Sequence, residues 1–378
     1  MRTSMPKKSS IIGIFFFLLL LLACNSGSET EPIYAGWTVG DSWDDGSGTK
    51  YGTILRSIDS GETWTRQGAG QIADVNMSGV FAVDPYTAWV VGSPDSGYGT
   101  IYHTTDGGNT WERKGSSNPA SADYVPDVSI GKVHAVGDDV WAVGGDPGSP
   151  AIILHTSNGG ETWTNHIPAW YEGNDLQGVY VVDSNTVWAT GGTRGTSVPE
   201  EEEYGIILKT IDGGQTWTSY HVDLVDIKEF DFILGISAAD ADTAWAVGGG
   251  GYVLLKTIDG GTNWTQQSNG VGGPGDLNEV YAVNTSRVWV AADTLIYWTT
   301  NGGESWENSI DHGLPSGALA VMGISAVSAQ EAWGSHAFYS GSIYHTTDGG
   351  NTWTTIKQLD REDLPGLWNI SFATQPIN

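Results

Sequence analysis

The chain of 378 residues contains a single cysteine, Cys24, and this scarcity excludes two common kinds of framework. A disulfide needs two cysteines, and a cysteine-based metal site needs several. The eight histidines show no metal-ligand spacing, so neither a metal site nor a cofactor is expected. We therefore expect packing and hydrogen bonds alone to hold the fold together.

Basic residues are also scarce. There are 16 Lys and Arg against 44 Asp and Glu, which gives a formal net charge of −28. Proteins bind nucleic acid largely through cationic contacts with phosphate, so nucleic acid is not expected as a partner. An acidic surface also keeps an extracellular protein soluble, so the charge by itself does not indicate a ligand.

Long apolar runs are limited to residues 11–22, near the N-terminus. Arg2, Lys7 and Lys8 precede this run, which is typical of a signal peptide over residues 1–23 and too short for a good membrane span. The sequence LLAC at residues 21–24 resembles a bacterial lipobox, which implies that Cys24 becomes the lipidated first residue, carrying palmitate or a similar chain. The alternative is an ordinary secreted protein with an incidental cysteine.

A lipidated Cys24 would be followed by a short polar tether, so residues 24–32 form a segment of their own. Asn25 provides no inner-membrane retention signal of the Asp type. We therefore expect a protein of the cell envelope, anchored in the outer membrane through its lipid only. The sequence leaves open whether it faces the periplasm or the cell surface.

Helical periodicity is absent, and an eight-residue pattern ending in Trp recurs along the chain instead. Its terminal tryptophans are spaced by 42 to 54 residues, which indicates a repeated structural unit. The seven copies are SIDSGETW (57–64), TTDGGNTW (104–111), TSNGGETW (156–163), TIDGGQTW (210–217), TIDGGTNW (257–264), TTNGGESW (299–306) and TTDGGNTW (346–353).

A second pattern alternates with the first, in which small or aliphatic residues surround a Trp that Gly usually follows, as in AWAVG at residues 244–248. Together the patterns predict four short strands in about 48 residues, the size of one propeller blade. Seven such units fill residues 33–378. The sequence therefore predicts an all-β fold, a seven-bladed β-propeller with four-stranded blades in one domain.

The two ends of this region are complementary. The chain enters on a Trp-Val-Gly strand at residues 35–40, and LWNISFA at residues 367–373 resembles a blade-opening strand. A closed ring leaves no strand edge unpaired. We predict that the C-terminal strand closes the first blade.

The octapeptide itself predicts a structural role rather than a reactive site. Its Asp accepts backbone N–H groups of a tight turn, the following Gly takes positive φ, and the Trp packs between blades. Two copies have Asn at the Asp position, and Asn cannot perform acid–base chemistry. The structural positions are Asp59, Asp106, Asn158, Asp212, Asp259, Asn301 and Asp348.

This octapeptide is identified as an Asp-box, or BNR repeat. Its alternation with a Trp-Ala-Val-Gly strand resembles the photosystem II assembly/stability-factor-like propellers. That resemblance implies a binding or assembly module that uses an arginine patch. The mature chain is poor in arginine and offers only six for such a patch: Arg56, Arg66, Arg113, Arg194, Arg287 and Arg361. Sialidases and xyloglucanases carry the same box, so the fold alone does not decide the function.

Two enzyme classes are alternatives to a binding role. A sialidase needs three clustered arginines, and Arg56 precedes the first box at a framework position. A glycoside hydrolase needs two carboxylates at a defined separation, and 44 acidic residues offer too many candidates to choose from. His103, His155 and His345 each precede a box at the same repeat position and are expected to be framework.

The departures from the repeat suggest where a ligand would bind. Loops between the second and third strands are expanded only in the first four blades, and the loop at residues 166–175 carries a Trp-Tyr pair. In a propeller these loops share one face, and the box turns lie on the other. The predicted ligand- or partner-binding residues on the face of the expanded loops are Trp43, Asp44, Asp45, Asp95, Tyr98, Trp170 and Tyr171. The alternative is that these are variable, solvated loops without a ligand.

The sequence thus favours a monomeric, outer-membrane-anchored, non-catalytic binding or assembly module whose partner is a protein or a glycan. A carbohydrate-active glycoside hydrolase on the same propeller is the alternative.

Overall fold

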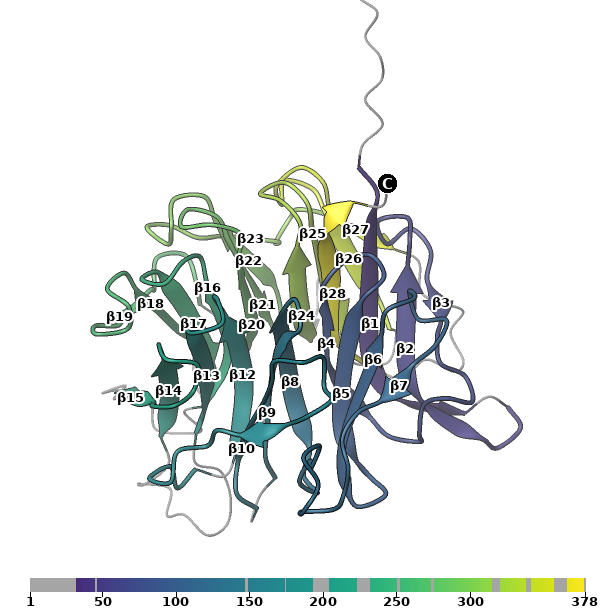
Figure 1. Cartoon of the computed structure of the whole chain (residues 1–378). Coiled ribbons are helices and arrows are strands. Elements are labelled where there is room, and N and C mark those ends of the chain that lie inside the picture. The colour runs from purple at the N-terminus through teal and green to yellow at the C-terminus, as the bar shows by residue number, and fades with distance from the viewer. Residues whose placement is uncertain are drawn as a thin grey trace, which may run out of the picture. The chain divides into compact units, whose positions relative to one another are not determined.

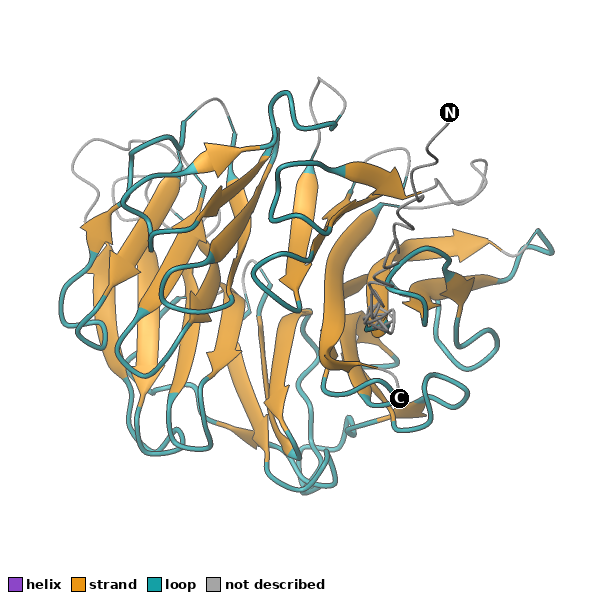
Figure 2. Ribbon diagram, turned by 90° about the horizontal axis from the view of Figure 1, so that it is seen from above, coloured by secondary structure: helices purple, strands orange, loops and turns teal. Residues whose placement is uncertain are grey.

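The computed structural model describes residues 32–376, except for 45, 147–148, 174, 193–203, 223–231, 250–251, 273–274, 315–319, 338–340 and 357–365. These residues form seven four-stranded antiparallel sheets around one axis (Figures 1 and 2). The predicted seven-bladed β-propeller is confirmed. Among the described residues there is no helix with the length and apolarity needed to cross a membrane.

Each blade has an inner, a second, a third and an outer strand. The inner strands are β4 (Met77–Ala82), β8 (Ile130–Val136), β12 (Asp175–Val181), β16 (Ile233–Ala238), β20 (Leu277–Ala282), β24 (Val321–Ala326) and β28 (Leu367–Pro376). The second strands are β1 (Tyr34–Asp44), β5 (Ala88–Asp95), β9 (Asp139–Gly144), β13 (Val187–Gly192), β17 (Ala244–Gly248), β21 (Val288–Ala292) and β25 (Ala332–His336).

The outer strand of each blade is shorter than the second strand of the same blade. The third strands are β2 (Lys50–Ser57), β6 (Tyr98–Thr104), β10 (Ile152–Thr156), β14 (Gly205–Thr210), β18 (Val253–Thr257), β22 (Ile296–Thr299) and β26 (Ile343–Thr346). The outer strands are β3 (Thr65–Arg66), β7 (Glu112–Arg113), β11 (Thr164–Asn165), β15 (Thr218–Val222), β19 (Thr265–Gln266), β23 (Glu307–Asn308) and β27 (Thr354–Ile356).

The C-terminal strand closes the ring, as predicted. The first blade has the order β28-β1-β2-β3, and Trp37 of β1 lies opposite Ser371 of β28. Phe372 stacks on Trp333 of the seventh blade, with ring centroids 3.7 Å apart, and meets Trp64 edge to face at 5.8 Å. β28 is therefore both a sheet partner for the first blade and a packing surface for the seventh.

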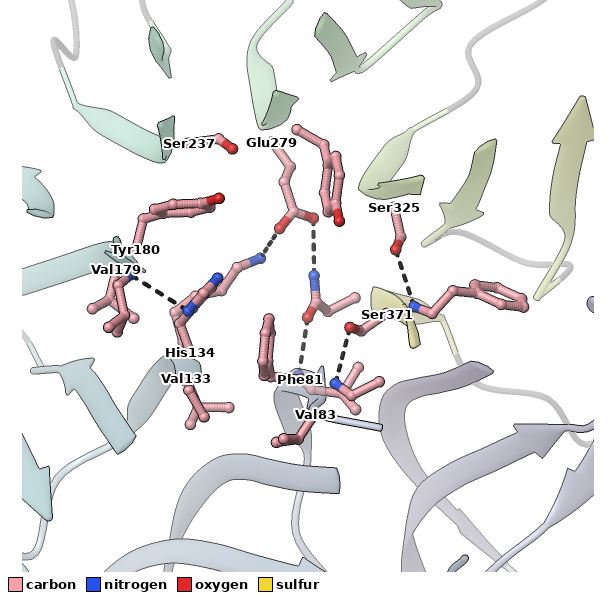
Figure 3. Close-up of a pocket in the computed structure, with 18 of the residues that line it drawn as sticks. Phe81, Val83, Val133, His134, Val179, Tyr180, Ser237, Glu279, Ser325 and Ser371 are labelled. Carbon is pink, nitrogen blue, oxygen red and sulfur yellow. Dashed lines mark hydrogen bonds and ion pairs between the residues drawn. The ribbon is translucent and has the colours of Figure 1, made fainter. Parts of the chain in front are cut away.

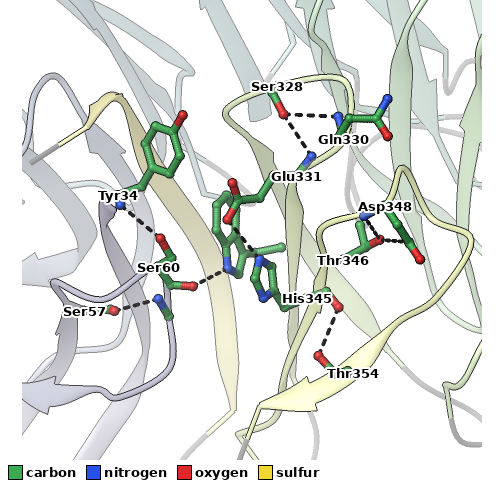
Figure 4. Close-up of polar contacts among 12 residues, drawn as sticks. Tyr34, Ser57, Ser60, Ser328, Gln330, Glu331, His345, Thr346, Asp348 and Thr354 are labelled. Atoms are coloured by element: carbon green, nitrogen blue, oxygen red, sulfur yellow. Dashed lines mark hydrogen bonds and ion pairs between the residues drawn. The ribbon is translucent and has the colours of Figure 1, made fainter. Parts of the chain in front are cut away.

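A second set of contacts joins the same two blades at the first box (Figure 4). Ser60 stands where most boxes have Gly, and its φ of 55° lies in the left-handed region. Its carbonyl oxygen accepts a hydrogen bond from the Trp333 indole at 2.9 Å, and its hydroxyl oxygen accepts one from the Tyr34 amide at 3.0 Å. Ser60, in its strained turn, thus connects the first blade to the seventh.

Tryptophans form the packing between neighbouring blades. The Trp of each second strand is almost fully buried, at 0–1 % exposure. In four cases the box Trp of the next blade meets it at a steep angle: Trp89 with Trp163, Trp141 with Trp217, Trp188 with Trp264, and Trp289 with Trp353. Such edge-to-face pairs add to the free energy of burying the rings.

In six blades the residue immediately before the box lies over the second-strand Trp of the same blade. The rings of His103, His155 and His345 stack on Trp89, Trp141 and Trp333, at centroid distances of 3.9, 4.1 and 4.7 Å. Arg56, Lys209 and Lys256 lie over the equivalent Trp rings of their own blades as cations. The prediction that these histidines are framework is confirmed.

The box Asp residues hold their turns by hydrogen bonds. In the fourth blade, Asp212 accepts bonds from the amide of Thr216 at 2.9 Å and from its hydroxyl at 2.6 Å. In the third blade, Asn158 accepts from the Thr162 amide at 3.1 Å, but its own amide donates to the Thr162 hydroxyl at 3.0 Å. The hydroxyl reverses its role, so Asn fills the position without a charge.

Asp212 offers a test of this exchange. The hydroxyl and amide of Thr216 hold the pKa of the Asp212 carboxyl at about 2, below its ordinary value of 3.8. Its stabilising contribution is therefore complete above about pH 4 and is lost as the pH falls towards 2. We expect Asp212→Asn to melt near the wild type at pH 7 and to lose less stability than the wild type between pH 4 and 2.

Thermal unfolding of the wild type, Asp212→Asn and Asp212→Ala between pH 2 and 7 measures this effect. Asp212→Ala should melt lower at pH 7, by on the order of 2 °C for a domain of this size. If Asp212→Asn melts as low as Asp212→Ala at pH 7, the charge is needed and Asn is not an equivalent.

The strand order gives the propeller two distinct faces. The boxes join third to fourth strands, on the face where β1 begins and β28 ends, at the top of Figure 1. We call this the box face. The loops from second to third strands lie on the opposite face. The connections from blade to blade begin beside the box of the next blade, as His166 does at Gly214, and run from there to the opposite face.

Candidate functional site: the propeller axis and the opposite face

The residues predicted to bind a ligand begin with Trp43, which lies near the end of β1 and is half-buried. The guanidinium of Arg66 lies 3.9 Å from the centre of its ring, and Tyr51 packs beside it with centroids 6.0 Å apart. Asp44 is exposed and accepts hydrogen bonds from the amides of Gly46 and Gly48. Asp45 lies outside the described residues.

The second blade repeats this arrangement. Arg113 lies over the ring of Tyr98 at 3.9 Å and forms an ion pair with Asp95 at 2.6 Å. Its guanidinium also donates to the backbone carbonyl of Asp95 at 2.6 Å. In both hairpins an arginine from the outer strand covers the aromatic ring, so these rings are less available than their sequence positions suggested.

Trp170 is the most accessible of the predicted aromatics, with half of its surface exposed. It lines a groove of about 530 Å³ that also includes His166 and the box residues Gly214 and Trp217 of the fourth blade. Tyr171 meets Trp170 edge to face at 6.5 Å. Burial raises the pKa of Tyr171, and its hydroxyl donates to the Asp175 carbonyl at 3.3 Å, so Tyr171 supports the loop more than it faces solvent.

The structure thus brings the predicted residues together in three local groups. Trp43 and Asp44 belong to the first blade, Asp95 and Tyr98 to the second, and Trp170 and Tyr171 to the connection between the third and fourth. Each group is held by its own hairpin or loop. Their role in binding stays a prediction.

A different set of polar residues meets on the propeller axis. Seven inner strands carry equivalent positions there, and four have glycine: Gly79, Gly178, Gly235 and Gly323. The other three have Lys132, Glu279 and Asn369. The ammonium of Lys132 lies 2.5 Å from one carboxylate oxygen of Glu279, and the other accepts a hydrogen bond from the Asn369 amide at 2.9 Å.

We call these three axial residues, Lys132, Glu279 and Asn369, the waist. They connect three blades whose inner strands are far apart in the sequence. Asn369 also accepts the amide of Val80 at 2.9 Å, and Glu279 accepts that of Ile324 at 3.2 Å. The glycines at the same level allow the close approach of neighbouring strands: a Cβ on Gly323 would lie 2.9 Å from the Ile370 nitrogen. The waist is therefore a charged crosslink in an otherwise glycine-lined layer.

One cavity lies on each side of the waist. The cavity towards the box face has a volume of about 590 Å³, and Phe81, His134, Tyr180 and Tyr281 line it together with three serines (Figure 3). The cavity towards the opposite face has about 470 Å³ and a more polar lining that includes Asp41, Asp146 and Asn278. Lys132 contributes to both.

Side chains in the box-face cavity tie neighbouring inner strands together. The hydroxyl oxygens of Ser237, Ser325 and Ser371 accept the backbone amides of Ala282, Phe372 and Ala82, each at 3.0 Å. His134 occupies the same strand position, and its Nδ1 accepts the amide of Val181 at 3.4 Å. Burial, with Lys132 nearby, lowers the pKa of His134 to about 3, so the ring is neutral and able to accept.

This arrangement gives little support for acid–base chemistry. The two acidic residues of the box-face cavity are Asp84 and Glu279. Asp84 accepts the amides of Tyr86 and Thr87, while Glu279 is held by Lys132 and Asn369. Among the described residues, no three His, Cys, Asp or Glu side chains are grouped to hold a metal ion.

Two stretches of the chain, residues 74–169 and 201–325, match the family of the photosynthesis system II assembly factor YCF48. Together they cover more than half of the 378 residues. The chain belongs to this family. No curated protein sequence matches it.

Solved structures of YCF48 are similar in fold. YCF48 bound to D1 peptide aligns with a TM-score of 0.52 and 20% identity, over 74% of this chain and 81% of that chain. YCF48 from Cyanidioschyzon merolae aligns with a TM-score of 0.53 and 18% identity, over 76% and 86%. U3-55K reaches 0.56 at 8% identity, over 79% and 86%, so at this level the likeness shows the fold alone.

The arginine patch that the YCF48 resemblance implied is not present in the part of the chain that the structure describes. Arg56, Arg66, Arg113 and Arg287 each lie over an aromatic ring of their own blade, at distances of 3.9–5.2 Å. Arg194 and Arg361 lie outside the described residues. The four described arginines therefore serve the framework of this YCF48-family propeller.

The waist and the box-face cavity were not predicted from the sequence. A signal was available, because aligning the seven inner strands shows Lys132, Glu279 and Asn369 where the other repeats have glycine. A charged residue at a glycine position of a repeat indicates a local exception. The sequence does not show which of these residues contact one another across the axis, because that depends on how the closed propeller arranges its blades.

Proposed function

We propose that this YCF48-family chain is a lipid-anchored, non-catalytic assembly factor of the cell envelope that binds a segment of a protein partner. The family membership carries the proposal, because a YCF48 structure contains a bound D1 peptide. The framework roles of the box carboxylates, the framework histidines and the described arginines support it, since they leave few groups for catalysis.

The partner of this chain differs in chemistry from one that needs an arginine patch. The described arginines are engaged by rings and carbonyls, and acidic residues outnumber basic ones by 44 to 16. Such a surface complements a basic or hydroxyl-rich segment. An accessible ring provides an anchor, and Trp170 is the exposed aromatic of the groove between the third and fourth blades.

The binding test compares two aromatics of the predicted surface, the exposed Trp170 and the half-buried Trp43. We expect Trp170→Ala to weaken partner binding at least tenfold without lowering the melting temperature, because truncated interface anchors often cost about 2 kcal/mol. Trp43→Ala should weaken binding less, since Arg66 already covers its ring. Trp111→Ala should lower stability instead, because Trp111 is 6 % exposed in the core between blades.

The partner is first captured by crosslinking and affinity purification from native membranes, and synthetic peptides covering its sequence are then titrated. Tyr86→Ala is the matched control, since Tyr86 is 53 % exposed but lies in the turn between β4 and β5 of the second blade, outside the groove that Trp170 lines. If Trp170→Ala and Trp43→Ala bind these peptides as tightly as the wild type, this surface is not the binding site.

The anchor has its own test. We expect Cys24→Ser to prevent acylation and to move the protein out of the outer-membrane fraction. Membrane fractionation and the intact mass of the mature protein measure both effects. A wild-type protein without lipid mass, or a Cys24→Ser protein with unchanged membrane association, would contradict the proposed anchor.

A further inference from the structure

The box-face cavity has the size of a small-molecule site. Its volume of about 590 Å³ lies in the range typical of ligand pockets. The waist forms its floor, and turn residues such as Val83 and Gly137 form its rim on the box face. A ligand would therefore enter along the propeller axis from that face.

One wall of the cavity is aromatic. The ring of His134 lies between Phe81 and Tyr180, at centroid distances of 4.1 and 4.5 Å. The three residues come from the inner strands of consecutive blades, β4, β8 and β12. All three are only partly buried, so their surfaces contribute to the cavity (Figure 3).

The other wall offers hydrogen-bond donors. The hydroxyls of Ser325 and Ser371 accept backbone amides, and each retains a proton that no described residue accepts. On the aromatic wall, His134 accepts through Nδ1, so in its neutral form it carries its proton on Nε2 as a further donor. The lining therefore suits a ligand edge that presents oxygen acceptors.

The charges of the lining favour a neutral ligand. Lys132 is the cation of the described lining, and its ammonium is already paired with Glu279. Asp84 at the rim is engaged by two backbone amides. An anionic ligand would have no free cation to neutralise it, and burying an unpaired charge is costly.

We propose that the box-face cavity binds one neutral pyranose ring, such as the terminal sugar of a glycan. The apolar C–H face of the sugar lies against Phe81, His134 and Tyr180, and its oxygen-bearing edge faces Ser325 and Ser371. This site is separate from Trp170 and does not depend on the proposed partner binding.

The test titrates methyl glucoside, methyl galactoside and N-acetylglucosamine into the full chain, in a detergent without a sugar headgroup. Saturation-transfer NMR detects the bound sugar, and glucuronate and p-cresol are the charged and the aromatic comparisons. We expect at least one neutral sugar to bind with a dissociation constant on the order of 1 mM, equivalent to about −4 kcal/mol.

Phe81→Leu removes one ring from the aromatic wall and should weaken the sugar roughly fivefold. Ser78→Ala is the matched control, because Ser78 lies on the same strand but lines the cavity of the opposite face. Trp170→Ala should bind the sugar as the wild type does, which separates this site from the proposed partner surface.

The proposal is overturned if no neutral sugar binds at 50 mM, roughly fifty times the expected dissociation constant. It is equally overturned if Phe81→Leu, with an unchanged melting temperature, binds sugar as the wild type does. Binding of p-cresol without any sugar would assign the cavity to an aromatic side chain instead.

Discussion

Deleting residues 366–378 should abolish the cooperative unfolding transition of the propeller or lower its midpoint by more than 10 °C. The deletion removes β28, in which Leu367, Ile370 and Phe372 are at most 2 % exposed. Burial of three such side chains contributes about 5–9 kcal/mol, which is comparable to the whole stability of a typical domain. It also leaves one edge of β1 without its hydrogen-bonding partner.

Thermal and urea unfolding of the truncated chain measure this loss. Deletion of residues 26–31 is the control, because the compact unit begins at Ile33. A synthetic peptide of residues 366–378 provides a second check, since a strand that closes the ring should restore the transition when added in trans. Equal midpoints for the two deletions would contradict the shared first blade.

The fold was predictable because the seven copies of the repeat can be aligned with one another within the single sequence. The box and the Trp strand each occur seven times, so the blade number, strand order and closing strand followed from spacing and from the unmatched ends. The exchange of Asp for Asn in two boxes also predicted their structural role. These inferences depend on features that are local to one repeat.

The predicted surface was less accessible to sequence reasoning, because exposure depends on what covers a loop. Trp43 and Tyr98 were identified as departures from the repeat, but the guanidiniums of Arg66 and Arg113 lie over their rings. Both arginines stand two residues after a box Trp, in the first two blades, and this spacing was the available signal. Tyr171 was expected beside Trp170 at the surface, whereas most of it is buried.

The axis could not be predicted because it joins residues from distant blades. Lys132 and Glu279 belong to β8 and β20, and no pattern within a single repeat relates them. Only the closed ring makes their side chains converge, and Asn369 joins them through the C-terminal strand. Sequence comparison between repeats identifies such exceptions, whereas their pairing depends on the three-dimensional arrangement.

The waist should therefore behave as one energetic unit. We expect Lys132→Met and Glu279→Gln each to lower the free energy of unfolding by about 2–3 kcal/mol, because either change leaves the partner charge largely buried and unpaired. The cost should stay below that of a fully buried pair, since 21% of the Lys132 side chain and 14% of the Glu279 side chain are exposed. The double variant should lose less than the sum of the two.

A double-mutant cycle by urea unfolding measures this coupling, and we expect an interaction energy of about 1 kcal/mol or more. Gln at position 279 keeps an acceptor for the Asn369 amide and the Ile324 amide, so the cycle isolates the charge from these hydrogen bonds. Strictly additive losses would show that Lys132 and Glu279 stabilise the ring independently. In that case the three axial side chains would be filling space between glycines rather than crosslinking three blades.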